Sequence, residues 1–148
     1  MLFRSWSIEA GGGIEAGGSI EAGGSIEAGG DIKAGGGIGA SRNIEAGLGI
    51  EAGEGISASW NIKAGLGIRA GEGLDAPWGI EAGWGVEAGL WISASNLSCN
   101  MRIFAGVIAS RLPSPSEMEI RAEVLAGTVA HGTVVPFEEA APAEEASP

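Results

Sequence analysis

Histidine and cysteine, the residues that most often supply a general base or a thiolate nucleophile, each occur once in this 148-residue chain, as His131 and Cys99. A catalytic base needs a substrate within hydrogen-bonding reach and is usually oriented by a further group. His131 instead lies in a short AHG sequence near the end of the chain, where a capping strand is expected. Cys99 occupies a place that the repeat described below gives to a small inward alanine, and no histidine or acidic motif accompanies it. We therefore expect no catalytic residue, no metal site and no cofactor.

The glycine-rich segments share only their composition with phosphate-binding loops. The stretch GGGIEAGG (residues 11–18) is followed by no helical pattern and lacks a GK[ST] element, so no nucleotide site is expected. The formal net charge of −11 argues against a nucleic-acid partner. An acidic solenoid that imitates DNA is a further alternative, but Lys33, Lys63 and Arg69 interrupt the acidic series.

The dominant feature of the chain is a six-residue repeat. An aliphatic residue stands at every sixth position from Ile8 to Ile92, and alanine follows each one two positions later. In a short strand, the first and third side chains share one face and the second points away. Isoleucine and alanine should therefore point inward, and the glycines that follow should turn a corner with positive φ.

A second period of 18 residues defines the cross-section. The segments NIEAGLG (43–49), NIKAGLG (61–67) and GIEAGWG (79–85) correspond at this spacing, so three hexads should make one turn. One outward column then alternates in sign at every step, and opposite charges one strand spacing apart attract. Its members are Glu15, Lys33, Glu51, Arg69 and Glu87. We predict an all-β fold, a triangular β-solenoid of about five to six coils with a C-terminal β cap.

The three-hexad coil resembles the hexapeptide-repeat, left-handed β-helix proteins over roughly residues 8–112. The resemblance implies a β-helix and, as an alternative function, acyl transfer, for which His131 at a subunit boundary would be needed. The family places its small inward residue two positions before the aliphatic one, whereas alanine follows it here. A right-handed triangular β-helix similar to the polymer-forming bactofilins therefore remains open. The IEAG arrays also resemble uncharacterised bacterial and prophage repeat proteins, which implies no activity.

Four segments are expected along the chain: an N-terminal cap (1–7), the hexapeptide solenoid (8–112), a C-terminal capping segment (113–135) and a disordered acidic tail (136–148). Alternation around Ile120 and Val124 indicates a strand, while Ser116 with Glu119 matches a capping box and leaves a short helix as the alternative. The single cysteine, the lack of a signal-peptide core and the lack of a long apolar run predict a soluble cytoplasmic protein without membrane partners.

The variable position at each corner holds the remaining candidates. It is glycine in the early hexads and holds larger residues later, charged at some steps and apolar at others, and the apolar ones should be exposed along two corners. Exposed apolar patches mark interfaces, and tryptophan is frequent among binding hot spots. We expect a non-enzymatic structural or binding protein that associates with itself or with a protein partner. The candidate contact residues are Leu48, Trp60, Leu66, Trp78 and Trp84.

Overall fold

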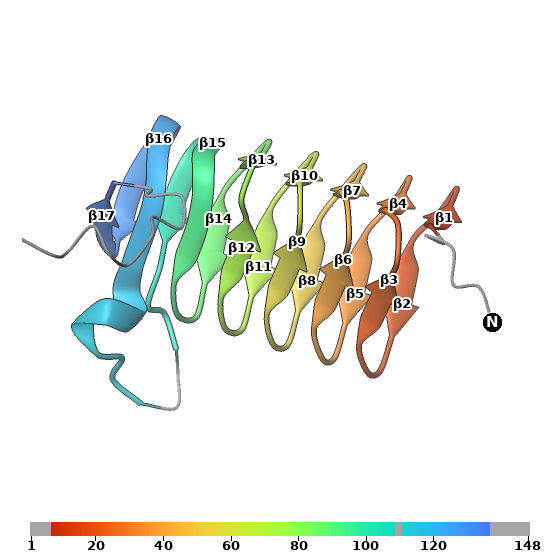
Figure 1. Ribbon diagram of the computed structural model, residues 1–148, viewed down its shortest axis with the longest axis horizontal. Helices are drawn as coiled ribbons and strands as arrows, with labels where there is room; N and C mark the ends of the chain where they lie inside the picture. Colours follow the sequence, from red (N-terminus) through yellow and green to blue (C-terminus); the bar gives the residue numbers. More distant parts are fainter. Residues whose placement is uncertain (1–6, 109–110, 137–148) are drawn as a thin grey trace, which may run out of the picture.

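The computed structural model describes residues 7–108 and 111–136, in which the hexads form a parallel β-solenoid. Each short strand pairs in register with the strand 18 residues away, as Ile8 does with Ile26 and Ile26 with Ile44. The strands stack side by side along the long axis of the molecule, with β1 at one end and β16 and β17 at the other (Figure 1). One turn therefore contains three hexads, which confirms the 18-residue period and the all-β solenoid.

Three columns of stacked strands form the three faces. The first face contains β1 (Ile8–Ala10), β4 (Ile26–Ala28), β7 (Ile44–Ala46), β10 (Asn61–Ala64) and β13 (Gly79–Ala82). The second face contains β2 (Ile14–Ala16), β5 (Ile32–Ala34), β8 (Ile50–Ala52), β11 (Ile68–Ala70) and β14 (Val86–Ala88). The third face contains β3 (Ile20–Ala22), β6 (Ile38–Ala40), β9 (Ile56–Ala58) and β12 (Leu74–Ala76).

Longer strands complete the C-terminal end. β15 (Ile92–Phe104) wraps around all three faces, pairing in turn with β12, β13 and β14. The 3-10 helix η1 (Pro115–Met118) precedes β16 (Glu119–His131), which pairs in parallel with β15, and β17 (Thr133–Val135) pairs with β16. The strand prediction for this segment is confirmed.

The solenoid has about seven turns, compared with the five to six predicted. The segment expected to close the array contributes a parallel turn of its own, in which Ile120, Val124 and Val129 lie beside Ile92, Leu97 and Ile103. These aliphatic residues are four and five positions apart and lack the IEAG pattern, so the hexad count does not register them. The acidic tail after Pro136 and the N-terminal cap before Ser7 lie outside the described residues.

The core consists of the repeated isoleucines and alanines. Ile26, Ile44 and Ile62 are fully buried, while Ile8 and Ile14 in the first turn are only half-buried. A single turn cannot bury its own apolar face, so each turn depends on neighbours on both sides. Within the described residues, no polar or charged residue is buried.

The corner glycines do not have the positive φ expected from the sequence. Positive φ occurs, among described residues, only at Gly106, Gly127 and Gly132 near the C-terminal end. From the second turn on, the glycine that directly follows alanine at the corners on either side of the second face is instead required by close approach between turns. A Cβ at Gly47, for example, would overlap the carbonyl oxygen of Gly29 one turn earlier. The preference for glycine therefore comes from the close approach of neighbouring turns and not from a left-handed (positive φ) backbone conformation.

Where the residue before the aliphatic one is Ser, Asp or Asn, its side chain can provide a second link between turns. Asp31 Oδ1 accepts a hydrogen bond of 2.8 Å from the backbone N–H of Gly49, and Asn43 Oδ1 accepts one of 3.1 Å from that of Asn61. The same bond is made by Ser7, Ser19 and Ser25. Side-chain acceptors at this position thus satisfy a backbone donor that the parallel ladder leaves free.

Candidate protein-interaction surface

The variable residues project from the corners because the backbone there is already bonded within the stack. The N–H of Trp60 donates to the carbonyl oxygen of Arg42 at 3.2 Å, and the N–H of Trp78 donates to that of Trp60 at 3.1 Å. The interior is filled by the neighbouring isoleucines and alanines. Side chains at these positions therefore point outward, in columns with one residue for each turn.

The tryptophan corner, formed by Arg42, Trp60 and Trp78, lies between the third and first faces. The two indole rings are nearly parallel, with an interplanar angle of 4° and centroids 5.0 Å apart. The Arg42 guanidinium carbon lies 5.5 Å from the centroid of the Trp60 ring, within the range of a cation–π contact. Trp78 remains 57 % exposed. This corner presents a preorganised, stacked aromatic pair to solvent.

The leucine corner, formed by Leu48, Leu66, Trp84 and Met101, lies between the first and second faces. Its backbone ladder runs from Leu66 to Leu48, from Trp84 to Leu66 and from Met101 to Trp84. Trp84 and Met101 are 56 % and 57 % exposed, Leu48 is also exposed and Leu66 is half-buried. Leu97 lies five positions after Ile92, and Met101 occupies the corner position four residues after Leu97; the sequence prediction did not include it.

The five candidate contact residues thus lie on two separate ridges that border the same face. Between the ridges runs the outward column of the first face, which includes Glu45, Lys63 and Glu81 in register. Lys63 Nζ lies 3.9 Å from Glu81 Oε1. The predicted surface is therefore two apolar edges separated by a charged strip and not one continuous apolar patch.

A groove runs along the leucine corner on the side of the second face. Leu66, Trp84 and Met101 line one side, and the charged column around Arg69 lines the other. Gly67, together with Gly49 and Gly85, contributes to its lining where the chain enters each strand. These glycines have no side chains to fill the space, so the groove between the apolar ridge and the charged ridge stays open.

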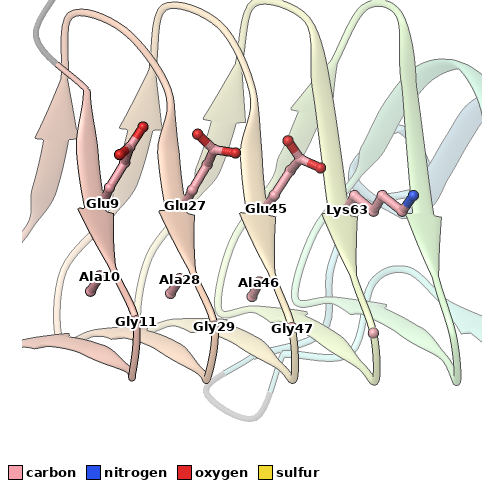
Figure 2. Close-up of a pocket in the computed structure, with 11 residues that line it drawn as sticks. Glu9, Ala10, Gly11, Glu27, Ala28, Gly29, Glu45, Ala46, Gly47 and Lys63 are labelled. Atoms are coloured by element: carbon pink, nitrogen blue, oxygen red, sulfur yellow. The ribbon is translucent and has the colours of Figure 1, made fainter.

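The N-terminal part of the first face carries three carboxylates in one row. Glu9, Glu27 and Glu45 lie in register, and Lys63 continues the row (Figure 2). A shallow hollow beside them is lined by corner glycines, including Gly29. Like charges stacked one strand apart disfavour this arrangement slightly. Within the described part of the chain, no group of three or more acidic, histidine or cysteine residues is arranged to hold a metal ion.

His131 and Cys99 lie in the C-terminal turns. Cys99 is buried in the position opposite Ala82, as its place in the repeat predicts, and burial raises the pKa of its thiol. His131 is exposed, and its Nδ1 lies 2.6 Å from the carbonyl oxygen of Ala105, to which it can donate. The Ala105 N–H donates in turn to the His131 carbonyl oxygen. These contacts join β16 to the end of β15.

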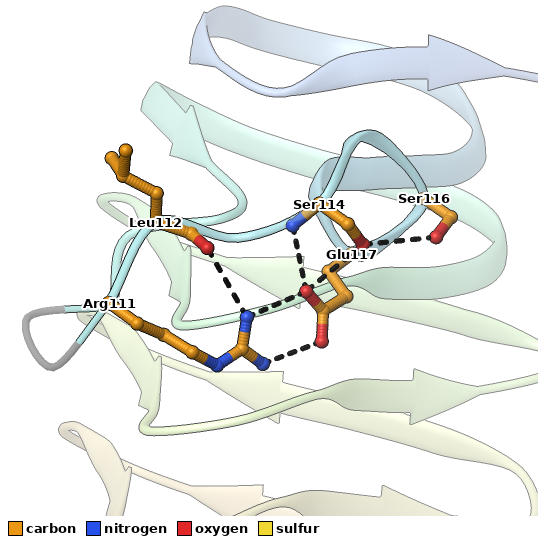
Figure 3. Close-up of polar contacts among 5 residues, drawn as sticks. All are labelled: Arg111, Leu112, Ser114, Ser116 and Glu117. Atoms are coloured by element: carbon orange, nitrogen blue, oxygen red, sulfur yellow. Dashed lines mark hydrogen bonds and ion pairs between the residues drawn. The ribbon is translucent and has the colours of Figure 1, made fainter.

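The connection into β16 is held by an ion pair. The Arg111 guanidinium meets both oxygens of the Glu117 carboxylate, at 2.6 and 2.8 Å, and Oε2 also accepts a 2.8 Å hydrogen bond from the Ser114 N–H (Figure 3). The Arg111 bonds and the Ser114 bonds lower the pKa of Glu117 to about 2. The alternative helix start at Ser116 and Glu119 is not formed; a capping box is made two residues earlier, by Ser114 and Glu117, at the start of η1.

Comparison with known proteins adds no relative: no protein family, curated protein or solved structure matches this chain. Among the described residues, no helix has the length and apolar character needed to cross a bilayer. The candidate surface therefore rests on the geometry of this molecule alone.

Proposed function

We propose that this chain is a non-enzymatic structural or binding protein that associates with itself or with a protein partner through the tryptophan and leucine corners. In this proposal it is a hexapeptide-repeat protein of the bacterial or prophage type that its IEAG arrays resemble. Its single buried thiol suits a reducing, cytoplasmic compartment.

The exposed, stacked pair Trp60 and Trp78 is the observation that carries the proposal. Each ring is held by its neighbour, so little side-chain entropy remains to be lost when a partner covers the pair. Aromatic anchors of this kind dominate the energetics of many protein interfaces. The leucine corner supplies a second apolar ridge within the same molecule.

The test is light scattering on size-fractionated protein across a dilution series. The variant Trp60→Ala/Trp78→Ala/Trp84→Ala should keep the wild-type circular dichroism spectrum and lose association or partner binding. Trp91→Ala is the matched control, because Trp91 is 37 % exposed but lies against Gly73 and outside both corners. A folded triple variant that associates as the wild type does would refute the role of the corners.

The alternative functions predict different outcomes for the same preparation. An acyltransferase-like protein should form a trimer with His131 at the subunit boundary, and His131→Ala should then abolish acyl transfer. A DNA mimic should bind a basic partner in a complex that dissociates as salt is added. Either result would replace the proposed function.

A further inference from the structure

The second face carries a column of charges that alternate in sign at every turn. Its register joins Glu15 to Lys33, Lys33 to Glu51, Glu51 to Arg69 and Arg69 to Glu87. Arg69 lies 3.9 Å from a Glu51 oxygen and 3.3 Å from a Glu87 oxygen. The Arg69 side chain is 64 % exposed and that of Glu51 55 %. Arg69 is therefore paired within the chain on both sides, while more than half of its side chain and of the Glu51 side chain still faces outward.

An alternating column can pair opposite charges with an antiparallel copy of itself, provided that the two-fold axis passes between two turns and not through a charge. If two copies met through this face with their solenoid axes parallel, each charge would lie opposite its own copy, and like charges would repel. If the axes are antiparallel and a two-fold axis passes between the turns of Glu51 and Arg69, Glu51 meets Arg69 of the second copy. The same operation brings Lys33 opposite Glu87 of the second copy. Symmetry repeats both contacts, as in any two-fold interface.

The leucine corner fits the same arrangement. The antiparallel two-fold axis places the leucine corner of one copy against the leucine corner of the other and reverses the order of the turns. Leu48 then lies opposite Leu66 of the second copy. Trp84 then lies opposite Gly30 of the second copy, where the absence of a side chain leaves room for the indole. The groove on this edge, between the apolar ridge and the charged ridge, is open to receive the facing side chains.

The opposite edge of the face is less favourable. Glu54 and Glu72, the corner residues between the second and third faces, are exposed and stacked by their backbones. The antiparallel operation brings Glu54 opposite Glu72 of the second copy. The contact should therefore be centred on the charge column and the leucine corner, away from these carboxylates.

We propose that a second copy of this chain docks antiparallel on the second face, with Glu51 opposite Arg69 of the second copy and the two leucine corners in contact. This inference rests on the self-associating form of the proposed function and names the face, the orientation and the register. It does not involve the tryptophan corner, which lies across the first face.

The test uses two charge reversals and their mixture. Glu51→Arg and Arg69→Glu each place like charges opposite each other in a homodimer, so light scattering should find each variant monomeric at concentrations where the wild type is dimeric. In an equimolar mixture, Arg at position 51 of one chain meets Glu at position 69 of the other, and Arg69 meets Glu51. The mixture should recover the dimer, and a mass tag on one chain should show that it contains one copy of each variant.

Lys63→Glu is the matched control, because it reverses an exposed charge of the same kind on the first face and should leave the dimer unchanged. Circular dichroism and thermal unfolding establish that each variant is folded. The neutral variants Glu51→Gln and Arg69→Gln should weaken the dimer without introducing repulsion. A monomeric wild type, single reversals that dimerise normally, or a mixture that stays monomeric would each overturn the proposed arrangement.

The same assay separates this inference from the proposed function. Both proposals use the leucine corner, so Trp84→Ala should weaken association under either; Trp60→Ala/Trp78→Ala and the charge reversals tell them apart. If the tryptophan pair proves essential for association and the charge reversals have no effect, the proposed function holds and the antiparallel arrangement is wrong.

Discussion

Replacing a corner glycine by alanine should have opposite effects in the middle of the solenoid and in its first turn. In the middle, a Cβ at Gly47 would overlap the carbonyl oxygen of Gly29, and the N–H of Gly47 donates to Ala28 O at 2.9 Å. The obstructing atom belongs to the backbone, so the two turns must separate locally. At Gly11, in the first turn, nothing lies within 4 Å of an added Cβ.

The magnitude follows from two terms. Alanine restricts the unfolded chain, which stabilises a protein by about 0.4–1 kcal/mol where the native backbone tolerates it. Both sites gain this term, since neither has positive φ. Overpacking costs about 1–3 kcal/mol, and only Gly47 experiences it. The free energy of unfolding of Gly47→Ala should therefore be about 1–3 kcal/mol below that of Gly11→Ala.

Urea unfolding followed by circular dichroism measures this difference. Ser59→Gly is the control at the corner between the third and first faces, where a Cβ is already accommodated, and it should cost only the backbone entropy of glycine, about 0.5–1 kcal/mol. Equal destabilisation by Gly47→Ala and Gly11→Ala would falsify the close-approach explanation and point to backbone conformation as the reason for the repeated glycines.

Three other perturbations test separate contacts. Asn43→Ala removes the acceptor for the Asn61 N–H and should lower the free energy of unfolding by about 1 kcal/mol in urea titrations, while Asn43→Ser should retain part of it; no loss in the alanine variant would contradict the proposed ladder. Because the folded pKa of Glu117 is lowered to about 2, its stabilisation is complete above its ordinary pKa near 4.5 and is lost as the pH falls toward 2. Hydrogen exchange near the Arg111 ion pair should therefore differ between wild type and Glu117→Gln at pH 6, with the difference vanishing near pH 2; a pH-independent difference would contradict this. Burial and a raised pKa should make Cys99 resistant to alkylation in the folded protein and reactive in urea, and rapid labelling of the native protein would contradict the buried position.

Much of the fold could be predicted because every turn repeats the same pattern of inward and outward side chains. The spacing of Ile8, Ile26 and Ile44 defines both the inward face and the 18-residue turn, and the alternating column confirms that register. The C-terminal turn could not be counted in this way. Val124 and Val129 contribute inward residues at irregular spacing, and only pairing with an existing turn identifies them.

The candidate contact residues were predicted one by one and were divided between two corners, because residues 18 apart stack. Exposure of Trp60, Trp78 and Trp84 follows from their place at the corner. That the two corners border the same face, and that Met101 extends the leucine corner, depend on the path of the chain around three faces. A linear pattern does not give the distance between corners.

By itself, the sequence determined which side chains are buried, how many residues make a turn and which charges lie in register. The six-residue period of isoleucine and alanine buries its apolar side chains only when each turn of three hexads lies over the next. Only the tertiary structure showed the reason for glycine at the corners, the segment that forms the last turn and the outward residues that border one groove. These properties arise from contacts between atoms 18 residues or more apart. The overlap between Gly47 and the oxygen of Gly29 exists only once the turns are stacked.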